Sequence, residues 1–408
     1  MNILLCNHYA GSHRHGMEYR PYYLAREWVR RGHHVTIVAA SRSHLRQQNP
    51  SCAERAAVEW IDGIRYVWLR TPPYAGNGIR RVANMFSFVG QLLRRGGDVV
   101  GDWRPDAVIA SSTYPLDILP THRLARRYHA KLLFEVHDLW PLTPMELGGM
   151  SRWHPFIMSL QWAEDFAYRR ADRVVSLLPK ADSYMRQRGM AADKFQHIPN
   201  GVDLGEWERC DQKLPESHER IIRDERQAGR FLVGYAGGHG LSNALEFLLA
   251  AAEQLRDQPV TFLLVGQGPE KPTLEQIAQV RGLTNVRFLA PLPKAAVPSF
   301  LTDMDALYLG WRRQPLYRFG ISANKLFDYM MAARPVIHSI ETAADPVAES
   351  GCGVCCAPED PAAIARATRE LLERHPDERQ RMGRLGREYV LRHHTYATLA
   401  DRFLEVLT

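Results

Sequence analysis

The sequence predicts an α/β protein made of two parallel-sheet domains. Short apolar runs that read as strands alternate with helical patterns along the whole chain, which is typical of parallel sheets covered by helices. Glycine-rich turns follow several of these runs, as is common where a strand passes into a helix. The chain has 408 residues and 45% hydrophobic content, enough to bury more than one core. We therefore expect two similar domains with a cleft, at residues 1–195 and 196–390, and a final segment at 391–408.

The first domain is expected to contain five main strands, at Ile3–Cys6, Val35–Ala39, Ala107–Ala110, Leu132–Val136 and Val174–Leu178. The pattern at Tyr19–Arg31 predicts a helix that ends at Gly32. Asp62-Gly63 predicts the turn of a hairpin or a bend in a strand. In Asn77–Gly97, apolar residues recur at helical spacing between pairs of arginines. This segment is either a core helix or a helix that lies in a membrane interface.

The second domain is expected to begin after a boundary within residues 180–230. Its predicted strands are Phe231–Tyr235, Thr261–Val265, Val286–Leu289, Ala306–Leu309 and Val336–Ser339, and its predicted helices are Ala244–Leu255, Leu274–Arg281 and Asn324–Ala332. The polar stretch Cys210–Gly229 is interpreted as a surface excursion. The tail Glu378–Thr408 is helical by pattern, with a break expected near His393–Tyr396.

Charge is spread unevenly along the chain. Residues 1–200 contain 27 Lys and Arg against 17 Asp and Glu, whereas the remainder contains 25 against 28. A basic first half suits an anionic surface such as lipid headgroups, or is a solvated face without a partner. Nucleic acid is not expected, because no arginine-rich tail, aromatic stripe or zinc-finger spacing accompanies the charge.

The cysteines and the N-terminus favour a cytoplasmic protein. The first residues read as a strand rather than a signal peptide, and no window has 18 consecutive apolar residues. The six cysteines are expected to be reduced. Cys352 and Cys355 have the spacing of half a redox or metal site, but no second pair or histidine cluster completes four ligands. An apolar strand after the Gly351 turn is expected there instead.

The most informative segment is Arg318–Ile337. A polar loop with one glycine opens a helix that carries Lys325 and Asp328, and the chain then passes into an apolar strand. The first amides of a helix have no partner within it, and the helix dipole adds partial positive charge, so a phosphate fits there. Ser322 or Asn324 can cap the helix, Lys325 supplies a full charge, and Asp328 can accept hydrogen bonds from sugar hydroxyls. The segment therefore predicts a site for a nucleotide diphosphate.

This segment also resembles a known signature. Ser-Ala-Asn-Lys-Leu-Phe-Asp-Tyr-Met at 322–330, followed by Ala-x-x-Pro-Val-Ile, resembles the donor site of family 4 retaining glycosyltransferases, in the bacterial branch that builds O-antigen and capsule repeats. The resemblance extends over nearly the full length, with 134–141 and 197–203 as its other specific parts. It implies the GT-B fold, in which two Rossmann-like domains face across a cleft and the last helix crosses back to the first domain.

The resemblance also implies roles for individual residues. Asp328 matches the helix acid that binds the ribose of a nucleotide sugar. Many family members have a second acid eight residues earlier, where this chain has Gly320. Many also follow the first strand of the second domain with a basic clamp for the diphosphate, whereas Gly237–Asn243 offers only His239, Ser242 and Asn243 as side-chain donors.

Positive charge must then come from elsewhere. The candidates are Lys325, Arg312, Arg313 and Arg318, although Arg312 and Arg313 are equally well explained as solvated loop residues. We expect backbone amides to supply the other donors. Together the expected donor-binding residues are Gly16, Gly238, His239, Gly240, Gly266, Gly320, Ile321, Ser322, Asn324, Lys325 and Asp328.

Two segments of the first half complete the predicted site. His137 and Asp138 follow a strand, and family members have a histidine there that touches the transferred sugar. The resemblance thus assigns His137 to a hydroxyl of the donor sugar and Asp138 to orienting it or the acceptor; with Lys325 they are the expected catalytic residues. In the family, the loop that precedes the first long helix faces the donor diphosphate and the acceptor, which places His13, Arg14 and His15 on the acceptor side.

The sequence lacks the motifs of several other enzyme classes. The loop at Gly11–Gly16 has the wrong spacing for a dinucleotide fingerprint, and no acid ends the second strand. The chain contains neither a Gly-x-Ser-x-Gly elbow nor a Walker loop.

The resemblance implies a retaining transferase that needs no metal or other cofactor. It favours a UDP-sugar donor, with an N-acetylated deoxyhexosamine as the sugar, and a glycan or polyprenyl-diphosphate-linked acceptor. Docking of the basic first domain on the inner membrane surface is consistent with such an acceptor. A nucleotide-sugar 2-epimerase of similar fold and a non-catalytic nucleotide-sugar-binding homologue remain alternatives.

Overall fold

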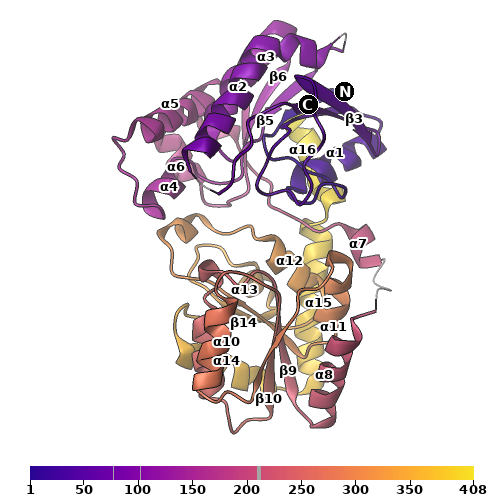
Figure 1. Ribbon diagram of the computed structural model, residues 1–408, viewed down its shortest axis with the longest axis vertical. Coiled ribbons are helices and arrows are strands. Elements are labelled where there is room, and N and C mark those ends of the chain that lie inside the picture. The colour runs from indigo at the N-terminus through magenta and orange to yellow at the C-terminus, as the bar shows by residue number, and fades with distance from the viewer. Residues whose placement is uncertain (77, 102, 209–212) are drawn as a thin grey trace. The chain divides into compact units, whose positions relative to one another are not determined.

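The computed structural model describes residues 1–76, 78–101, 103–208 and 213–408. It divides into two compact units (Figure 1). Unit 1 comprises Met1–Asn200 together with Tyr396–Thr408, and unit 2 comprises Gly201–Thr395. The chain thus passes between the units after Asn200 and after Thr395, whereas the sequence-based boundaries were 195 and 390.

Unit 1 contains an eight-stranded sheet with the order β3-β4-β2-β1-β5-β6-β7-β8. All neighbouring strands are parallel except β3 and β4. The strands are β1 (Asn2–Cys6), β2 (His34–Ala40), β3 (Ala56–Ile61), β4 (Ile64–Leu69), β5 (Ala107–Ala110), β6 (Lys131–Val136), β7 (Arg173–Ser176) and β8 (Phe195–His197). The helices are α1 (Arg20–Arg30), α2 (Ile79–Val100), α3 (Ile118–Tyr128), α4 (Leu142–Glu146), α5 (Pro155–Arg170), α6 (Asp182–Gln187) and α16 (Tyr396–Leu407).

Unit 2 contains a six-stranded parallel sheet with the order β11-β10-β9-β12-β13-β14. The strands are β9 (Phe231–Ala236), β10 (Val260–Val265), β11 (Val286–Leu289), β12 (Ala306–Gly310), β13 (Val336–Ser339) and β14 (Gly353–Cys356). The helices are α7 (Leu204–Glu208), α8 (Glu216–Gln227), α9 (Leu245–Glu253), α10 (Lys271–Val280), α11 (Val297–Thr302), α12 (Asn324–Met331), α13 (Pro346–Ser350), α14 (Pro361–Glu373) and α15 (Pro376–His393).

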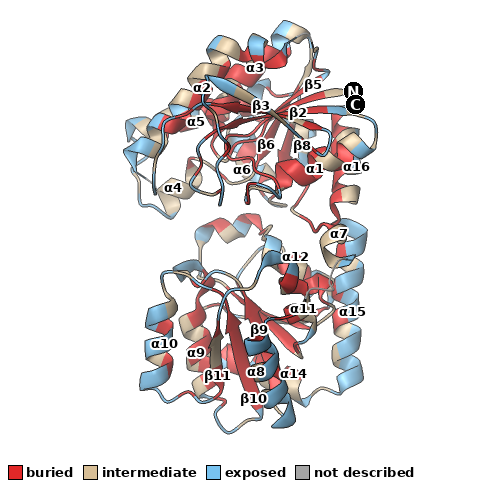
Figure 2. Cartoon of the chain, turned by 45° about the vertical axis from the view of Figure 1, so that its right-hand side comes forward, coloured by how far each residue is buried: buried red, intermediate tan, exposed pale blue. Residues whose placement is uncertain are grey.

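Both sheets are buried between helices, which explains why their strands read as continuous apolar runs (Figure 2). The exceptions are edge strands: β3, which is antiparallel, and β8 and β14 consist mostly of exposed or half-buried residues. The hairpin turn between β3 and β4 uses Asp62 and Gly63, both with positive φ, as the sequence predicted. The predicted two-domain α/β fold is confirmed.

The C-terminal helix α16 belongs to unit 1, as the resemblance implied. It packs on α1 through Trp28 and Phe403, whose ring centroids lie 5.2 Å apart, and Trp28 Nε1 donates to the Ala400 carbonyl. Arg31 of α1 also pairs with Asp401. The predicted break in the tail is confirmed, because α15 ends at His393 and α16 begins at Tyr396.

The structure corrects two expectations. The stretch Cys210–Gly229 is not only a surface loop: helix α8 occupies 216–227, while residues 209–212 lie outside the described residues. The helix was not recognised from the sequence because only two of its residues, His218 and Ile222, are buried, which gives no apolar periodicity. His218 is polar and bonds the Ala290 carbonyl through Nε2. The short strand β8 was missed, since three residues give no readable pattern.

The apolar helix of the first half belongs to the core. It begins at Ile79, so Asn77 of the expected range lies outside the described residues, and Met85, Phe88 and Leu92 are buried. The core alternative therefore accounts for the buried side of this segment, whereas Ile79 and Phe86 of the same pattern are exposed. No helix in the described part of the chain combines the length and apolar character needed to cross a bilayer.

Candidate active site

Strand order identifies where each unit is expected to bind a ligand. In unit 2 the order reverses between β9 and β12, and ligands of open α/β sheets bind beyond the carboxyl ends of strands at such a point. The loops that leave this point are 237–244 after β9 and 311–323 after β12. In unit 1 the order reverses between β1 and β5, and the loops are 7–19 and 111–117.

Helix α12 begins with an apolar N-cap at the switch point of unit 2. Its N-cap is Ala323, whose methyl side chain cannot accept a hydrogen bond from the first turn. Neither Ser322 nor Asn324 is thus the N-cap residue that the sequence suggested, because Ser322 precedes the N-cap and Asn324 is already the first helical residue. A first turn without a polar N-cap side chain leaves backbone N–H groups available to an anion.

Lys325 is fixed beside this turn. Its Nζ donates to Asn243 Oδ1 at 2.5 Å and to the Tyr235 hydroxyl at 3.1 Å. Tyr235 and Asn243 both donate in turn to the Gly238 carbonyl. Burial lowers the pKa of Lys325 to about 8. These contacts hold an ammonium group between the loop after β9 and the start of α12, where the sequence predicted it.

Gly320 has a backbone that explains the absent acid. Its φ is 91° and its ψ is −176°, a conformation that is essentially restricted to glycine. Gly320 and Ile321 are buried, Ser322 is half-buried and Asn324 is exposed. An acidic side chain at position 320 would therefore be strained in this loop.

Asp328 lies close to other charged groups of unit 2. It accepts a hydrogen bond from Trp207, and burial raises its pKa to about 7, which Lys294 opposes and Glu206 reinforces. Lys294 itself pairs with Glu206 at 2.6 Å. The carboxyl group is half-buried, so it remains partly accessible to a hydroxyl group.

His239 is the second unusual group at this edge. Its side chain is fully buried, and its ring nitrogens meet no partner by strict hydrogen-bond geometry among the described residues, although the ring also interacts with the Val265 backbone. The ring lies between Tyr235 and Phe288, at centroid distances of 5.8 and 6.1 Å. Burial lowers the pKa of His239 to about 4, with Lys271 and Lys325 adding to the effect. Since buried polar atoms are nearly always hydrogen-bonded, and the Val265 backbone can engage only one ring nitrogen, the other nitrogen indicates a missing ligand or water.

The two glycine clusters of unit 2 contact each other. A Cβ at Gly266 would lie 1.9 Å from the Gly237 carbonyl oxygen, and one at Gly268 would overlap the backbone of His239. Packing of one loop against the other therefore accounts for Gly266. In contrast, Gly238 and Gly240 have no heavy atom closer than 4.0 Å to an added Cβ, which leaves room for a ligand beside their backbone.

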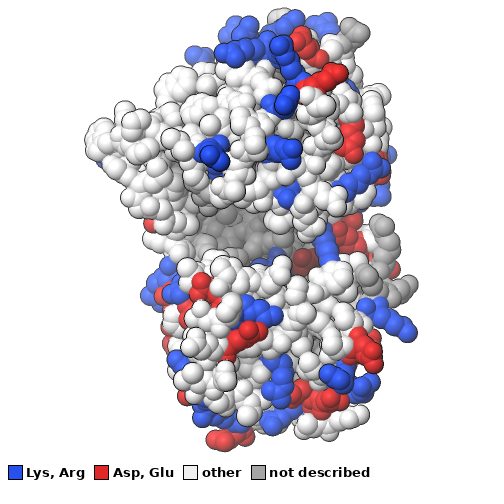
Figure 3. Space-filling view, viewed as in Figure 1, with Lys and Arg blue, Asp and Glu red and all other residues white. Residues whose placement is uncertain are grey.

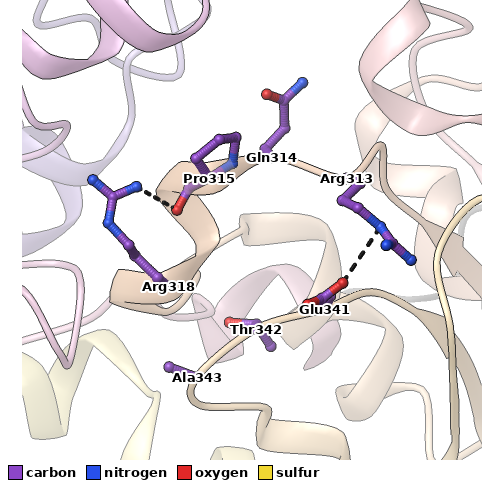
Figure 4. Close-up of a pocket in the computed structure, with 7 residues that line it drawn as sticks. All are labelled: Arg313, Gln314, Pro315, Arg318, Glu341, Thr342 and Ala343. Carbon is purple, nitrogen blue, oxygen red and sulfur yellow. Dashed lines mark hydrogen bonds and ion pairs between the residues drawn. The ribbon is translucent and has the colours of Figure 1, made fainter.

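The arginines after β12 are already paired. Arg312 pairs with Glu246 and lies 3.8 Å from Glu359, and Arg313 lies 3.4 Å from Glu341. Arg318 donates to the Pro315 carbonyl. Arg313 and Arg318 line a pocket of about 550 Å³ with Gln314, Pro315, Glu341, Thr342 and Ala343 (Figure 4). Arg312 is thus not the solvated loop residue that one interpretation of the sequence expected, because two glutamates surround it.

His137 belongs to a buried polar network in unit 1. Its Nε2 lies 3.0 Å from Ser111 Oγ and 3.2 Å from Glu135 Oε2. Ser111 donates its own proton to Glu135. On the other side, Arg20 Nε donates to Glu135 Oε1 at 2.9 Å, and Arg20 also donates to the Pro199 and Ile198 carbonyls.

This network fixes the tautomer of a neutral His137. Burial alone would raise the pKa of Glu135, but Arg20, His137 and Ser111 hold it at about 2. An ionised carboxylate only accepts hydrogen bonds, so the proton of a neutral His137 lies on Nε2. Nδ1 then carries the lone pair, and it has no partner among the described residues. His137 can therefore accept a hydrogen bond from a hydroxyl group.

Asp138 makes its contacts within its own turn. It accepts hydrogen bonds from the Leu139 amide, the Thr143 hydroxyl and Trp140 Nε1. No hydrogen bond joins it to His137 in the described structure. The expected role of Asp138 in orienting a substrate thus gains no support, since these contacts account for the residue without one.

The loop after β1 is largely closed on itself. The Gly16 amide donates to the Ser12 carbonyl, so it is not available to a phosphate. His15 is buried against Trp68 and bonds Ser12, and burial lowers its pKa although Glu59 opposes the shift. The expectation that Gly16 and His15 face a ligand is not supported. His13 and Arg14 are half-exposed, with Asp62 at 3.6 Å from His13 and Glu59 at 3.5 Å from Arg14.

Several residues that build these edges were missed from the sequence. They are Arg20, Ser111, Glu135, Tyr235 and Lys271, whose Nζ donates to the Gly266 and Leu289 carbonyls. Glu135 left a readable signal, because it is a single acid within the apolar strand β6. The others look like ordinary helix, strand and turn residues.

One three-residue group has the chemistry of a metal site. His338, Asp345 and Cys355 bring their ligand atoms within 4.8 Å of one another. Trp311 Nε1 donates to His338 Nε2, so the ring proton lies on Nδ1 and is donated to Asp345. An ion at Nδ1 would have to displace this proton and break the Trp311 bond, so the arrangement favours a hydrogen-bonded network. Cys355 lies in β14, as the predicted strand after Gly351 requires.

Comparison with known proteins identifies the family. Residues 15–201 match the glycosyl transferase 4-like domain, and residues 230–374 match the glycosyl transferases group 1. A putative colanic acid biosynthesis glycosyl transferase, WcaI of Escherichia coli, is 23% identical over 85% of this chain and 86% of its own length. The probable glycosyltransferase WbjE of Pseudomonas aeruginosa is 23% identical over 72% of each chain.

Among solved structures, Anabaena HepE in complex with UDP and glucose has a TM-score of 0.68 at 17% identity, covering 100% of this chain and 99% of its own. This likeness shows the fold. The two family matches and the order of strands in both sheets show that this chain belongs to the family 4 retaining glycosyltransferases of the GT-B fold.

Proposed function

We propose that this glycosyltransferase takes a sugar from a nucleotide diphosphate sugar and transfers it to a glycan or polyprenyl-diphosphate-linked acceptor in surface polysaccharide biosynthesis. The observation that carries the donor assignment is the first turn of α12, whose N-cap is an alanine, with Lys325 held beside it. Backbone amides, a helix dipole and one buried ammonium group together make a diphosphate site. The open backbone at Gly238 and Gly240 supports the same location, as do the ring nitrogens of His239, which meet no partner by strict hydrogen-bond geometry among the described residues.

The donor is proposed to be a UDP-sugar, with an N-acetylated deoxyhexosamine favoured. HepE, which has the same fold, is described in complex with UDP and glucose. WcaI is named for colanic acid biosynthesis, which supports a polysaccharide role for a chain that matches it over most of its length. The sugar assignment follows from the resemblance to the O-antigen branch.

The proposed reaction retains configuration at the anomeric carbon by front-face substitution. The acceptor oxygen forms a bond to the anomeric carbon as the bond from that carbon to the phosphate oxygen breaks. The leaving phosphate oxygen takes the proton of the acceptor hydroxyl, so charge and atoms balance. Lys325 and the amides of α12 stabilise the diphosphate, which removes the need for a metal ion.

Two further groups are assigned to sugar recognition. Nδ1 of His137 is proposed to accept a hydrogen bond from a hydroxyl of the transferred sugar, because Glu135 and Ser111 occupy Nε2. Asp328 is proposed to bind the ribose hydroxyls. Unit 1 is proposed to bind the acceptor, and the protein is placed in the cytoplasm at the inner face of the membrane, which the basic surface of unit 1 contacts.

Ligand-dependent thermal stabilisation tests the donor. A nucleotide present at about 100 times its Kd is expected to stabilise the protein by roughly 2.7 kcal/mol. UDP and UDP-sugars should raise Tm more than GDP and GDP-sugars. If neither Lys325→Ala nor Asp328→Ala weakens nucleotide binding, the donor site is assigned wrongly.

Turnover assays test the reaction. Product should form only when acceptor is added, since conversion of the nucleotide sugar alone would indicate an epimerase. Activity should persist in chelator, and a trapped covalent glycosyl-enzyme would overturn the front-face mechanism.

A further inference from the structure

Helix α5 of unit 1 presents an apolar stripe to solvent. Trp153, Met158 and Trp162 are 68%, 51% and 55% exposed, respectively. Met158, Trp162, Phe166 and Arg170 follow one another at intervals of four residues, so they lie along one side of the helix. Trp153 immediately precedes the N-cap residue, His154. A residue at that position lies on the same side of the helix as the fourth helical residue, here Met158. We call Trp153, Met158, Trp162 and Phe166 the α5 stripe.

The stripe is a continuous aromatic surface with a basic end. Trp162 lies 5.9 Å from Phe166, and Phe166 packs edge-on against His122 of α3 at 5.1 Å. Arg170 lies over the Phe166 ring at 5.9 Å, and Arg152 lies over Trp153 at 4.4 Å. Arg126 of α3 acts electrostatically on the same His122.

Acidic groups are few on this surface, and the exposed one, Asp172 after the end of α5, acts on His122 in opposition to Arg126 and Arg170. Between Leu147 and Ala171, a fully described stretch, Glu164 is buried and accepts hydrogen bonds from Tyr168 and Tyr184. Asp165 is bonded to Arg188 in a two-point contact. The exposed charges of the stretch are therefore all positive: Arg152, Arg169 and Arg170. In Figure 3 the surface over α4 and the beginning of α5 is largely uncharged, while Lys and Arg gather elsewhere on unit 1.

We propose that the α5 stripe docks unit 1 on the surface of an anionic phospholipid bilayer. Tryptophan side chains favour the membrane interface because they are apolar with one polar edge, and arginines beside them pair with lipid phosphates. From Met158 to Arg170 the stripe runs about 18 Å, long enough to lie along a bilayer surface. The side-chain amide of Gln161 is bonded to Glu164 and Asp165, so aromatic rings, Met158 and arginines are the groups that this side of the helix presents.

The proposal specifies which surface of unit 1 makes the membrane contact named in the proposed function. Only the biological reason for that contact rests on the proposed function. Vesicle binding is measured with the full chain and no substrate. It can therefore fail while nucleotide binding and sugar transfer succeed, and the reverse can also occur.

The first experiment is co-sedimentation with vesicles of phosphatidylglycerol and phosphatidylcholine, compared with phosphatidylcholine alone. We expect binding to the mixed vesicles, and a loss of about ten-fold or more in the double variant Trp153→Ser and Trp162→Ser. The double variant Arg152→Ser and Arg170→Ser should lose about five-fold per charge on anionic vesicles. Trp60→Ser is the matched control, because Trp60 is 63% exposed on β3 of the same unit.

The second experiment is quenching of tryptophan fluorescence by brominated lipid. The parent protein and Trp60→Ser should be quenched, and the Trp153→Ser and Trp162→Ser variant should not. The proposal is overturned if all variants bind the vesicles equally or if the parent protein does not bind anionic vesicles. It is also overturned if sedimentation velocity shows a dimer that depends on the α5 stripe in place of vesicle binding. Variants are compared only when their Tm values are equal. If the double tryptophan variant misfolds, vesicle binding by the Arg152→Ser and Arg170→Ser variant tests the proposal instead.

Discussion

At the carboxyl edge of the unit 1 sheet, Glu135 contacts Arg20, Ser111 and His137, and almost every polar atom nearby is used within the protein. At the equivalent edge of unit 2, the N-cap of α12 is an alanine, and the ring nitrogens of the buried His239 meet no partner by strict hydrogen-bond geometry among the described residues. One edge is preorganised by many internal bonds, although His8 Nε2 and Asp117 Oδ1 there are, like Nδ1 of His137, without a partner of strict hydrogen-bond geometry among the described residues. The other leaves donors open for a ligand. Changes in unit 1 should therefore affect stability first, and changes in unit 2 should affect nucleotide binding first.

The largest effect is expected for Glu135→Ala. It leaves Arg20 as a buried cation without its carboxylate, which should lower the free energy of unfolding by about 3–5 kcal/mol. Chemical denaturation measures this loss. The double variant Arg20→Met and Glu135→Leu should recover much of it, because no buried charge is left unpaired. If Glu135→Ala is as stable as the parent protein, this edge is not held together by the ion pair.

Lys325→Met is expected to keep the fold and to impair the reaction. The methionine retains the apolar stem but removes the charge beside the diphosphate, so kcat/KM should fall about 100-fold while Tm changes little. Steady-state kinetics and UDP titration measure the effect. Lys180→Met, at an exposed position of unit 1, serves as the control. Unchanged UDP affinity in Lys325→Met would show that the carboxyl edge of the unit 2 sheet does not bind the diphosphate through Lys325.

His239→Leu separates ligand binding from stability. Because the ring nitrogens have no partner of good hydrogen-bond geometry within the described protein, an apolar side chain of similar size should leave stability little changed or higher. Nucleotide affinity should nevertheless fall by about ten-fold if a ligand satisfies those nitrogens. Calorimetric titration with UDP and thermal unfolding are measured on the same sample. A loss of stability with unchanged affinity would mean that His239 is a structural residue.

The smallest effect concerns pH. Since burial lowers the pKa of Lys325 to about 8, the free protein loses this charge as pH rises through that value. The Kd for UDP should rise about three-fold between about pH 7.5 and 8.5. Lys325→Met should show none of this dependence. A pH-independent Kd in the parent protein would show that the ammonium group does not contribute.

The sequence by itself determined the layered fold and the position of the nucleotide edge. Buried parallel strands are continuous apolar runs, and the run at 318–337 combines a glycine, a lysine and a helix start within a few residues. These patterns are formed by residues that are close together in the sequence, so they can be recognised without knowledge of the tertiary structure. The assignment of Lys325 and the turn at Asp62-Gly63 were readable for this reason, and Glu135 was detectable as a lone acid in an apolar strand.

Only the tertiary structure decided which polar groups are free. Gly16 and His15 are used inside their own loop, and Arg312 is surrounded by glutamates from positions 246 and 359. Gly266 is required by the loop that packs against it. The exposed side of α5 is likewise invisible in a sequence, where Trp153 and Trp162 look like core residues. For Arg312 and Gly266 the partner is distant along the chain, and for Gly16 and His15 it is the folded path of the loop that brings Ser12 close, so the local pattern alone does not show which polar groups are bonded.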